Sequence, residues 1–367
     1  MRPSWVEVDL DAIAHNVGAF ARTVDPAEVL SVVKADAYGH GAVEVATTVL
    51  QAGATWLAVA LVEEAAELRE AGVTAPILLL SEPPVADAAD VRRWRITPSV
   101  YHADFVEALG AGSEPLGVHL LVDTGMHRVG VGPEDAPGLA QLIDQQPSLR
   151  LDGVWTHFAV AESDPAFTAA QSARFSAVLQ EIRDAGIDPG IIHQSNSAGA
   201  LYIDPGGDMA RIGLGTYGIH PDPDRPAADL RPAMKIVSHV SHVARHPAGA
   251  RPSYGRRMPL RSDANVATIP IGYADGVPRV ISLRGGSVLI GGERRPFAGV
   301  ITMDQTMVVC GDDVVTVGDE VVLIGRQGGE EITVDEWAAL ADTISWEILC
   351  GIGDRLPRHH LPVQSQP

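Results

Sequence analysis

Eight short apolar segments, separated by stretches with helical spacing of apolar residues, constrain the fold of this chain most strongly. Val43–Leu50, Glu63–Ala71 and Phe175–Ala185 are examples of the helical stretches. Strands that alternate with helices form parallel βαβ units, and eight such units are typical of a TIM (βα)8 barrel. The chain is therefore predicted to be an α/β protein with this barrel. The apolar segments are Val29–Val33, Trp56–Ala60, Ile77–Leu80, Ile96–Val100, Val118–Val122, Val154–His157, Ile191–His193 and Met209–Gly213.

Beyond about Arg231 the helical spacing gives way to strand-like runs separated by turn signals such as Ala274-Asp275-Gly276. The 367 residues suffice for a large domain and a smaller one. We expect a barrel over residues 10–230 and a C-terminal mainly-β domain over 231–367, which the N-terminal strand 1–9 could join. The Pro-rich stretch Pro221–Pro232 is the predicted linker. The predicted strands are Lys235–Ala244, Val266–Ile271, Ser287–Ile290, Met307–Val309 and Val321–Ile324.

Composition excludes several classes of function. The formal net charge is −20, which argues against a nucleic-acid partner, because phosphate binding needs clustered Lys and Arg. Cys310 and Cys350 are the two cysteines, so we expect neither a disulfide framework nor a zinc site. The first ten residues lack the apolar region of a signal peptide, and no apolar run reaches the ~18 residues of a membrane helix. We expect a cytoplasmic enzyme.

Polar residues gather at the predicted C-terminal ends of the strands, where TIM barrels carry their active sites. Lys34 follows the first strand, and Asp123-Thr-Gly-Met-His-Arg128 follows the fifth. His157 ends the sixth strand, His193 leads on from the seventh, and Arg211 lies in the eighth. These residues are therefore the first candidates for chemistry.

Lys34 is the sharpest candidate. Burial inside a barrel lowers the pKa of a lysine from its usual value near 10.4, and a desolvated amine is what a Schiff base requires. The alternative is a solvated amine at the barrel rim. The sequence that follows favours a ligand site, because two glycines flank His40 and Tyr38 offers a hydroxyl to an anion.

The segments after the last two barrel strands are where many barrels bind phosphate. Ser197 supplies a hydroxyl, and Gly213 and Gly215 leave room for backbone N–H donors. The alternative is that these glycines only form turns. Taken alone, Arg211 fits a structural salt bridge better than a cofactor contact.

A set of motifs spread along the chain resembles the alanine racemases. Lys34 within Val-Val-Lys-Ala-Asp-Ala-Tyr-Gly-His-Gly matches the lysine motif of that family, and further motifs match in order over nearly the whole chain. These are Asp123-Thr-Gly-Met-His-Arg128, Thr156-His157-Phe158, Asn196-Ser197-Ala198, Arg211-Ile-Gly213, Ser253-Tyr254-Gly255, Gly272-Tyr273-Ala-Asp-Gly276 and Met303-Asp304-Gln305.

The resemblance implies a barrel that binds pyridoxal 5'-phosphate (PLP), followed by a β domain. It implies racemisation of alanine by two bases, Lys34 and Tyr254, with Tyr254 supplied by the partner subunit of a homodimer. The D-alanine formed would serve peptidoglycan synthesis. A tyrosine with an ordinary pKa near 10 is a poor base at neutral pH, and His157 beside Arg211 resembles the network that tunes it.

The family also assigns positions around the cofactor and the substrate. Arg211 would face the pyridine nitrogen with support from His193, and a guanidinium there would suppress transamination because it does not readily give up its proton. Asn196 would lie near the phosphate loop. The phosphate would be held by Tyr38, Ser197, Gly213 and Leu214, the substrate carboxylate by Arg128 and the backbone at Met303, and the substrate site would include Tyr273 and Asp304.

Three positions depart from the family pattern. Asp36 replaces a frequent asparagine, which is a small change. Leu121 stands where many members have a carbamylated lysine that supports the carboxylate-binding arginine. Trp346 replaces a tyrosine that helps to bind phosphate and shapes the inner gate, and an indole is larger and can only donate a hydrogen bond. Trp346 leaves substrate preference open.

Other functions remain as alternatives. A racemase for serine or for a broader set of amino acids is the nearest, since one pocket substitution retunes side-chain choice by only ~1–3 kcal/mol. Basic amino-acid decarboxylases share the architecture but carry a Cys-Gly-Pro-type motif, which neither Cys310 nor Cys350 provides. Non-enzymatic PLP carriers consist of a barrel alone, without a β domain and its Tyr254.

Overall fold

The computed structural model describes residues 2–203 and 206–363. Its described residues form two compact units. We call the first, residues 12–37 and 42–231, the barrel unit. The second, drawn from residues 1–11, 38–41 and 232–367, is the β unit. The barrel unit is thus interrupted once along the sequence, because residues 38–41, shortly after the predicted site lysine, belong to the β unit.

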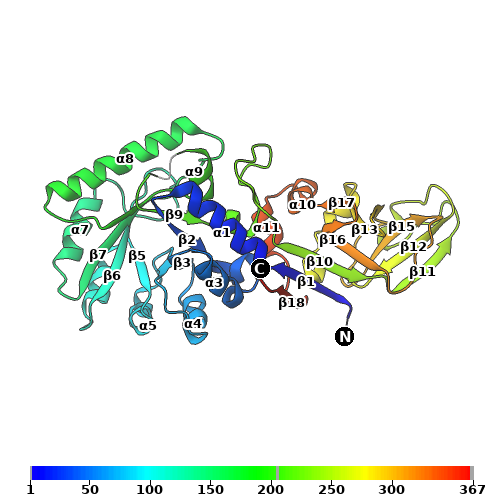
Figure 1. Cartoon of the computed structure of the whole chain (residues 1–367), viewed down its shortest axis with the longest axis horizontal. Helices are drawn as coiled ribbons and strands as arrows, with labels where there is room; N and C mark the ends of the chain where they lie inside the picture. The colour runs from blue at the N-terminus through cyan, green and yellow to red at the C-terminus, as the bar shows by residue number, and fades with distance from the viewer. Residues whose placement is uncertain (1, 204–205, 364–367) are drawn as a thin grey trace. The chain divides into compact units, whose positions relative to one another are not determined.

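The barrel unit contains eight parallel strands in the order β8-β7-β6-β5-β4-β3-β2-β9, so the first barrel strand pairs with the last (Figure 1). Loop hydrogen bonds link β8 and β9, from Asp208 N to Ile192 O at 2.7 Å and from Arg211 N to Ser195 O at 2.9 Å. The predicted (βα)8 barrel is confirmed, with a strand at each of the eight predicted apolar segments. The strands are β2 (Glu28–Val32), β3 (Trp56–Val59), β4 (Ile77–Leu79), β5 (Thr97–Val100), β6 (Leu116–Leu121), β7 (Leu149–Trp155), β8 (Ile191–His193) and β9 (Met209–Ile212).

Helices lie outside these strands (Figure 1). The longest, α8, begins after Asp164, whose carboxylate accepts a hydrogen bond from Phe167 N, and it buries Phe175 and Ile182. No helix within residues 2–203 and 206–363 has the length and apolar character needed to cross a membrane. The helices of this unit are α1 (Leu10–Val24), α2 (Lys34–Gly39), α3 (Ala42–Gln51), α4 (Val62–Glu70), η1 (Val85–Asp87), α5 (Ala88–Arg93), α6 (Ala103–Gly110), α7 (Ala136–Asp144), α8 (Pro165–Asp184), α9 (Ser197–Tyr202) and η2 (Leu214–Tyr217).

The β unit contains two sheets, one in the order β14-β13-β16-β10-β1-β18 with β17 paired to β16, and one in the order β11-β12-β15. The N-terminal strand β1 pairs antiparallel with β10 and parallel with β18. Arg2 and the fully buried Asp275 form an ion pair at 2.6 Å in this unit. Its strands are β1 (Ser4–Asp9), β10 (Met234–His239), β11 (His242–His246), β12 (Ala264–Ile269), β13 (Ser287–Ile290), β14 (Glu293–Pro296), β15 (Thr306–Gly311), β16 (Glu320–Gln327), β17 (Glu330–Ile332) and β18 (Arg358–Leu361).

The predicted single strand Lys235–Ala244 is wrong, because the chain changes sheets in its middle. Val240 N donates to Asp319 O at 2.9 Å, whereas Ser241 N donates to Thr268 O at 2.8 Å, so neighbouring residues pair with different strands. The helices of the unit are short and lie between or after the strands. They are η3 (Tyr254–Arg256), η4 (Tyr273–Asp275), η5 (Arg279–Leu283), α10 (Val334–Ala341) and α11 (Ser345–Cys350).

Polar and aromatic side chains occupy part of the barrel interior. The rings of Trp56 and His119 lie 5.3 Å apart, and Trp155 Nε1 donates to Ser99 Oγ at 3.1 Å. His119 is fully buried, and burial, with the charge of Arg211 as the second cause, lowers its pKa to about 3. The folded protein therefore holds this histidine neutral.

We predict that acid destabilises the protein partly through His119. In the unfolded chain this histidine is protonated below about pH 6.5. In the folded protein it stays neutral down to about pH 3. Stability is thus full above pH 6.5 and falls by about 1.4 kcal/mol per pH unit below it for one such group. Urea unfolding at pH 7 and pH 5 should show a loss that is ~2 kcal/mol smaller in His119→Asn than in the wild type. Equal losses in both proteins would contradict this.

Candidate active site

Lys34 lies at the C-terminal end of β2, half-buried, as the first residue of α2. The next four residues all have φ between 51° and 55°, so α2 is a left-handed turn. Such a conformation costs L-residues about 1–2 kcal/mol each. Two carboxylates secure it, since Glu64 accepts from Ala35 N at 2.6 Å and Asp36 accepts from Ala42 N at 2.7 Å. An asparagine oxygen could accept the same bond, so Asp36 is a small departure here as well.

Arg211 lies in β9 with 2% of its surface exposed. Burial lowers its pKa to about 9, so it remains a charged donor at neutral pH. Among the described residues no carboxylate forms an ion pair with it. Its guanidinium donates instead to four neutral acceptors, which are Thr156 O at 2.7 Å, His193 Nδ1 and Gln194 O, both at 3.1 Å, and His157 Nδ1 at 3.3 Å.

The indole of Trp155 provides the other attraction for this buried charge. The guanidinium carbon of Arg211 lies 4.4 Å from the centre of the Trp155 ring, a cation–π contact. The same indole stacks on His193, with ring centres 5.6 Å apart and planes 14° apart. Trp155 therefore fixes both the arginine and the histidine that supports it.

His157 follows β7 and is neutral at physiological pH. Burial lowers its pKa to about 3, with the charges of Arg211, Arg128 and Lys34 as further causes in that order. Because Arg211 donates to Nδ1, the single proton of the neutral ring lies on Nε2. Three cations thus surround one uncharged imidazole in the barrel unit.

The loops after β8 and β9 meet at Ser197. Its hydroxyl oxygen accepts from Gly213 N at 3.0 Å and from Gly215 N at 3.4 Å. Leu214 begins the short helix η2 directly after Gly213. Asn196 caps α9, accepting from Gly199 N at 2.9 Å. A hydroxyl and backbone N–H donors therefore converge where the sequence predicted a phosphate site.

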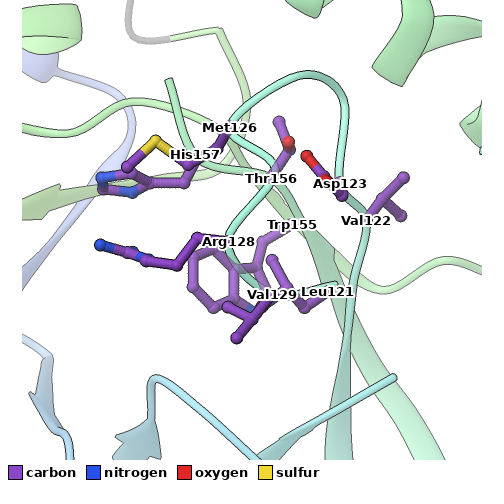
Figure 2. Close-up of a pocket in the computed structure, with 9 residues that line it drawn as sticks. All are labelled: Leu121, Val122, Asp123, Met126, Arg128, Val129, Trp155, Thr156 and His157. Carbon is purple, nitrogen blue, oxygen red and sulfur yellow. The ribbon is translucent and has the colours of Figure 1, made fainter. Parts of the chain in front are cut away.

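Arg128 lines a small pocket at the end of β6 together with Leu121, Trp155 and His157 (Figure 2). Its side chain points to the same side as that of His157, away from Asp123 (Figure 2). Among the described residues no carboxylate pairs with Arg128. Leu121 is buried and offers no polar atom to this arginine.

Asp123 organises that loop. Its carboxylate accepts from Gly125 N and His127 N, both at 3.0 Å, and contacts His127 Nδ1 at 3.1 Å. These bonds lower the pKa of Asp123 despite its partial burial, which acts in the opposite direction. The carboxylate closes a turn in which His127 has a φ of 53°, directly before Arg128.

The remaining predicted residues belong to the β unit. The loops that carry Tyr273 and Met303 are joined by hydrogen bonds from Tyr273 N to Thr302 O at 3.0 Å and from Ala274 N to Met303 O at 3.1 Å. Asp304 pairs with Arg355 at 2.7 Å. The unit thus brings Tyr273, Met303 and Asp304 together.

Three more of the residues predicted from the sequence also lie in the β unit. Tyr38 is buried, which raises the pKa of its phenol, with Cys350 as a second cause. Tyr254 is 75% exposed, and Trp346 lies half-buried in α11. The structure places each within this unit, whereas Lys34, Arg211 and Ser197 belong to the barrel unit.

Two residues that contact this site were missed by the sequence analysis. His119 contacts His193, with Nδ1 and Nε2 2.9 Å apart, and Trp155 lies over Arg211. Both sit within barrel strands, where alternation alone does not distinguish a polar interior position from an apolar one.

The donors at this end of the barrel fit PLP chemically. Lys34 offers an amine for an aldehyde, and the Ser197 hydroxyl, whose oxygen accepts from Gly213 N, keeps its own proton as a donor for a phosphate. Three of the four acceptors around Arg211 lie at Nη2 and the fourth at Nη1, so the Nε–H and the second Nη1–H have no acceptor among the described residues and can serve a ring nitrogen.

Comparison with known proteins agrees with this fit. The family model "Alanine racemase, N-terminal domain" matches residues 8–221, and "Alanine racemase, C-terminal domain" matches residues 233–360. An alanine racemase of Symbiobacterium thermophilum is 44% identical over 98% of this chain and 97% of that protein. One from a Nostoc species is 40% identical over 97% of this chain and 95% of that protein.

Solved structures agree over the same length. The alanine racemase of Bacillus anthracis with bound L-Ala-P has a TM-score of 0.92 and 37% identity, over 99% of this chain and 96% of that one. That of Streptomyces coelicolor has a TM-score of 0.93 and 35% identity, over 98% of both chains. Because both family models and full-length relatives match, the chain belongs to the alanine racemase family.

Proposed function

We propose that this chain is a PLP-dependent racemase that interconverts L- and D-alanine in the cytoplasm and supplies D-alanine for peptidoglycan. The observation that carries the proposal is the donor set of the barrel unit, with Lys34, Ser197 and Gly213 beside a buried Arg211. The cofactor-binding domain is proposed to span residues 10–230, and the mainly-β domain residues 231–367 with strand 1–9.

Lys34 would bind PLP covalently through its amine, and Arg211 would donate to the ring nitrogen with His193 behind it. Asn196 holds the loop that begins at Ser197. The phosphate would be held by Tyr38, Ser197, Gly213, Leu214 and Trp346.

Bound PLP supplies an electron sink for the charge that develops at the substrate Cα. Two bases on opposite faces move the proton: the amine of Lys34 and the phenol of Tyr254. One removes the proton from Cα and the other returns one to the opposite face. Neutral His157 accepts from Arg211 through Nδ1 and keeps an Nε2 proton for hydrogen bonding, which suits a residue that tunes the tyrosine.

Arg211 limits the chemistry to racemisation. It is charged at neutral pH despite burial, and a guanidinium does not readily transfer its proton to a ring nitrogen. The electron sink is therefore weak, which disfavours transamination.

Arg128 and the backbone at Met303 would bind the substrate carboxylate, and Tyr273 and Asp304 would complete the substrate site. With Leu121 beside it, Arg128 depends on the loop closed by Asp123. Lys34 and Tyr254 belong to different units, and Tyr254 is largely exposed, which supports a homodimer whose partner supplies the tyrosine.

We predict that Lys34→Ala abolishes racemisation of L-alanine and the visible absorbance of the bound cofactor, since its amine would form the covalent bond. The sequence offers an unusually sharp control, because Lys235 is its one other lysine and pairs with Glu7 and Glu320 in the β unit. Lys235→Arg should keep both signals. After borohydride reduction, peptide mapping should find the label on Lys34. A label on Lys235 with full activity in Lys34→Ala would disprove the assignment.

We predict that Lys34→Ala and Tyr254→Phe proteins, each inactive, complement one another after subunit exchange. A mixed dimer holds one intact site, so random exchange should restore roughly a quarter of the wild-type activity. Exchange is followed independently with two affinity tags. Exchange without any activity would rule out the shared site.

We predict that Trp346→Tyr changes substrate preference more than cofactor retention. Indole N–H can still donate to a phosphate, whereas its bulk alters the space beside the substrate side chain. The ratio of kcat/KM for L-Ala and L-Ser should shift by the ~1–3 kcal/mol of one pocket contact. PLP occupancy after dialysis is measured in parallel. An unchanged ratio with a large loss of PLP would make Trp346 a cofactor residue instead.

A further inference from the structure

A line of three buried side chains runs from the predicted cofactor site into the barrel. Arg211 Nη1 lies 3.1 Å from His193 Nδ1, and His193 Nε2 lies 2.9 Å from His119 Nδ1. His193 and His119 are fully buried. The line begins on β9, crosses β8 and ends on β6.

The direction of these hydrogen bonds follows from the guanidinium. An arginine can only donate, so His193 Nδ1 must accept and carries no proton. Burial and the charges around it keep the pKa of His193 well below its usual value, so the ring is neutral and its proton lies on Nε2. That proton points to His119 Nδ1, which must accept in turn.

The opposite tautomer of His193 is incompatible with this arrangement. A proton on Nδ1 would face the guanidinium N–H, so two donors would oppose each other. Nε2 would then lack its proton, and His119 would have to turn donor. By accepting a hydrogen bond from Nε2, His119 stabilises the tautomer of His193 that Arg211 needs.

Gly153, which has no side chain, leaves room in the barrel for the imidazole of His119. A Cβ at Gly153 would lie 2.7 Å from His119 Cε1 and 2.8 Å from Nδ1, closer than side chains approach. The ring of Trp56 also packs against it, its centre 5.3 Å away and its plane tilted by 48°. Glycine at 153 and the neighbouring indole fix the position of the imidazole.

If position 119 served only to pack the barrel interior, a histidine would be less favourable there than an apolar residue. Its Nε2 is buried and has no hydrogen-bond partner among the residues described. An unpaired buried donor destabilises a fold, and an apolar side chain would avoid it. The acceptor that His119 offers to His193 explains the presence of a histidine here.

We propose that His119 is a positioning residue that holds His193 in its Nε2-protonated tautomer and thereby holds the guanidinium of Arg211 in its orientation toward the cofactor. The last step rests on the proposed function, because it takes Arg211 to face the ring nitrogen of PLP. His119 itself contacts neither cofactor nor substrate in this scheme.

The experiment compares two substitutions in the holoenzyme. His119→Asn keeps an acceptor where Nδ1 stands, whereas His119→Leu has similar size but no acceptor. Leucine removes one unpaired N–H and creates another at His193, so the thermal midpoint of His119→Leu should stay near that of the wild type. We expect His119→Leu to lower kcat for L-alanine about 10-fold, with KM within roughly 2-fold, as for other groups that orient a contacting residue. His119→Asn should stay near the wild type.

Ring ¹⁵N shifts in histidine-labelled protein, assigned with His193→Gln, report the tautomer independently of activity. The wild type and His119→Asn should show His193 protonated on Nε2, and His119→Leu should show a mixture. An Nδ1 proton in the wild type would overturn the proposal, and so would equal kcat losses in both variants. A wild type without racemase activity would refute the proposed function instead, while the tautomer measurement would still decide the role of His119.

Discussion

The pairing of the first barrel strand with the last is the constraint on which the site depends. Leu30 of β2 stands opposite Arg211 of β9, although 181 positions separate them in sequence (211 − 30). This parallel register carries Lys34, just beyond β2, to the strand end beside Gly213, just beyond β9. An amine, a guanidinium and a phosphate-type cradle thus share one end of the barrel because the sheet closes there.

A charge inside the barrel has to be stabilised without a counter-ion. Arg211 has no carboxylate partner among the described residues, and a buried carboxylate would compete with a ring nitrogen for its donors. Carbonyl oxygens, two neutral imidazoles and the Trp155 ring supply the attraction instead. Burial lowers the pKa of each neighbouring histidine, and the same positive charge lowers it further, so His119, His157 and His193 are all neutral.

The sequence was sufficient for the barrel and for the strand-end residues, because both depend on local patterns. Ile191–His193 and Ser287–Ile290 form strands over the predicted bounds. Lys235–Ala244 was not predictable as two strands, since the break at Val240 and Ser241 depends on partners far along the chain. His119 was missed for a related reason: its contacts with Gly153 and His193 are tertiary, and no local pattern marks them. The roles of Tyr254 and Trp346 came from family resemblance, since spacing alone does not assign them.

The left-handed turn after Lys34 is a strained backbone segment next to the amine that is proposed to react. Four non-glycine residues from Ala35 to Tyr38 take a conformation that each would avoid, and only the fifth, Gly39, takes it without penalty. Gly39 is also required sterically, because a Cβ there would lie 2.8 Å from Leu349 O. Such strain persists only where surrounding bonds enforce it, and Glu64 and Asp36 provide them on the barrel side. A right-handed helix would begin with the same residues but would carry Tyr38 in a different direction, so the turn directs the chain from Lys34 to the tyrosine proposed to bind phosphate.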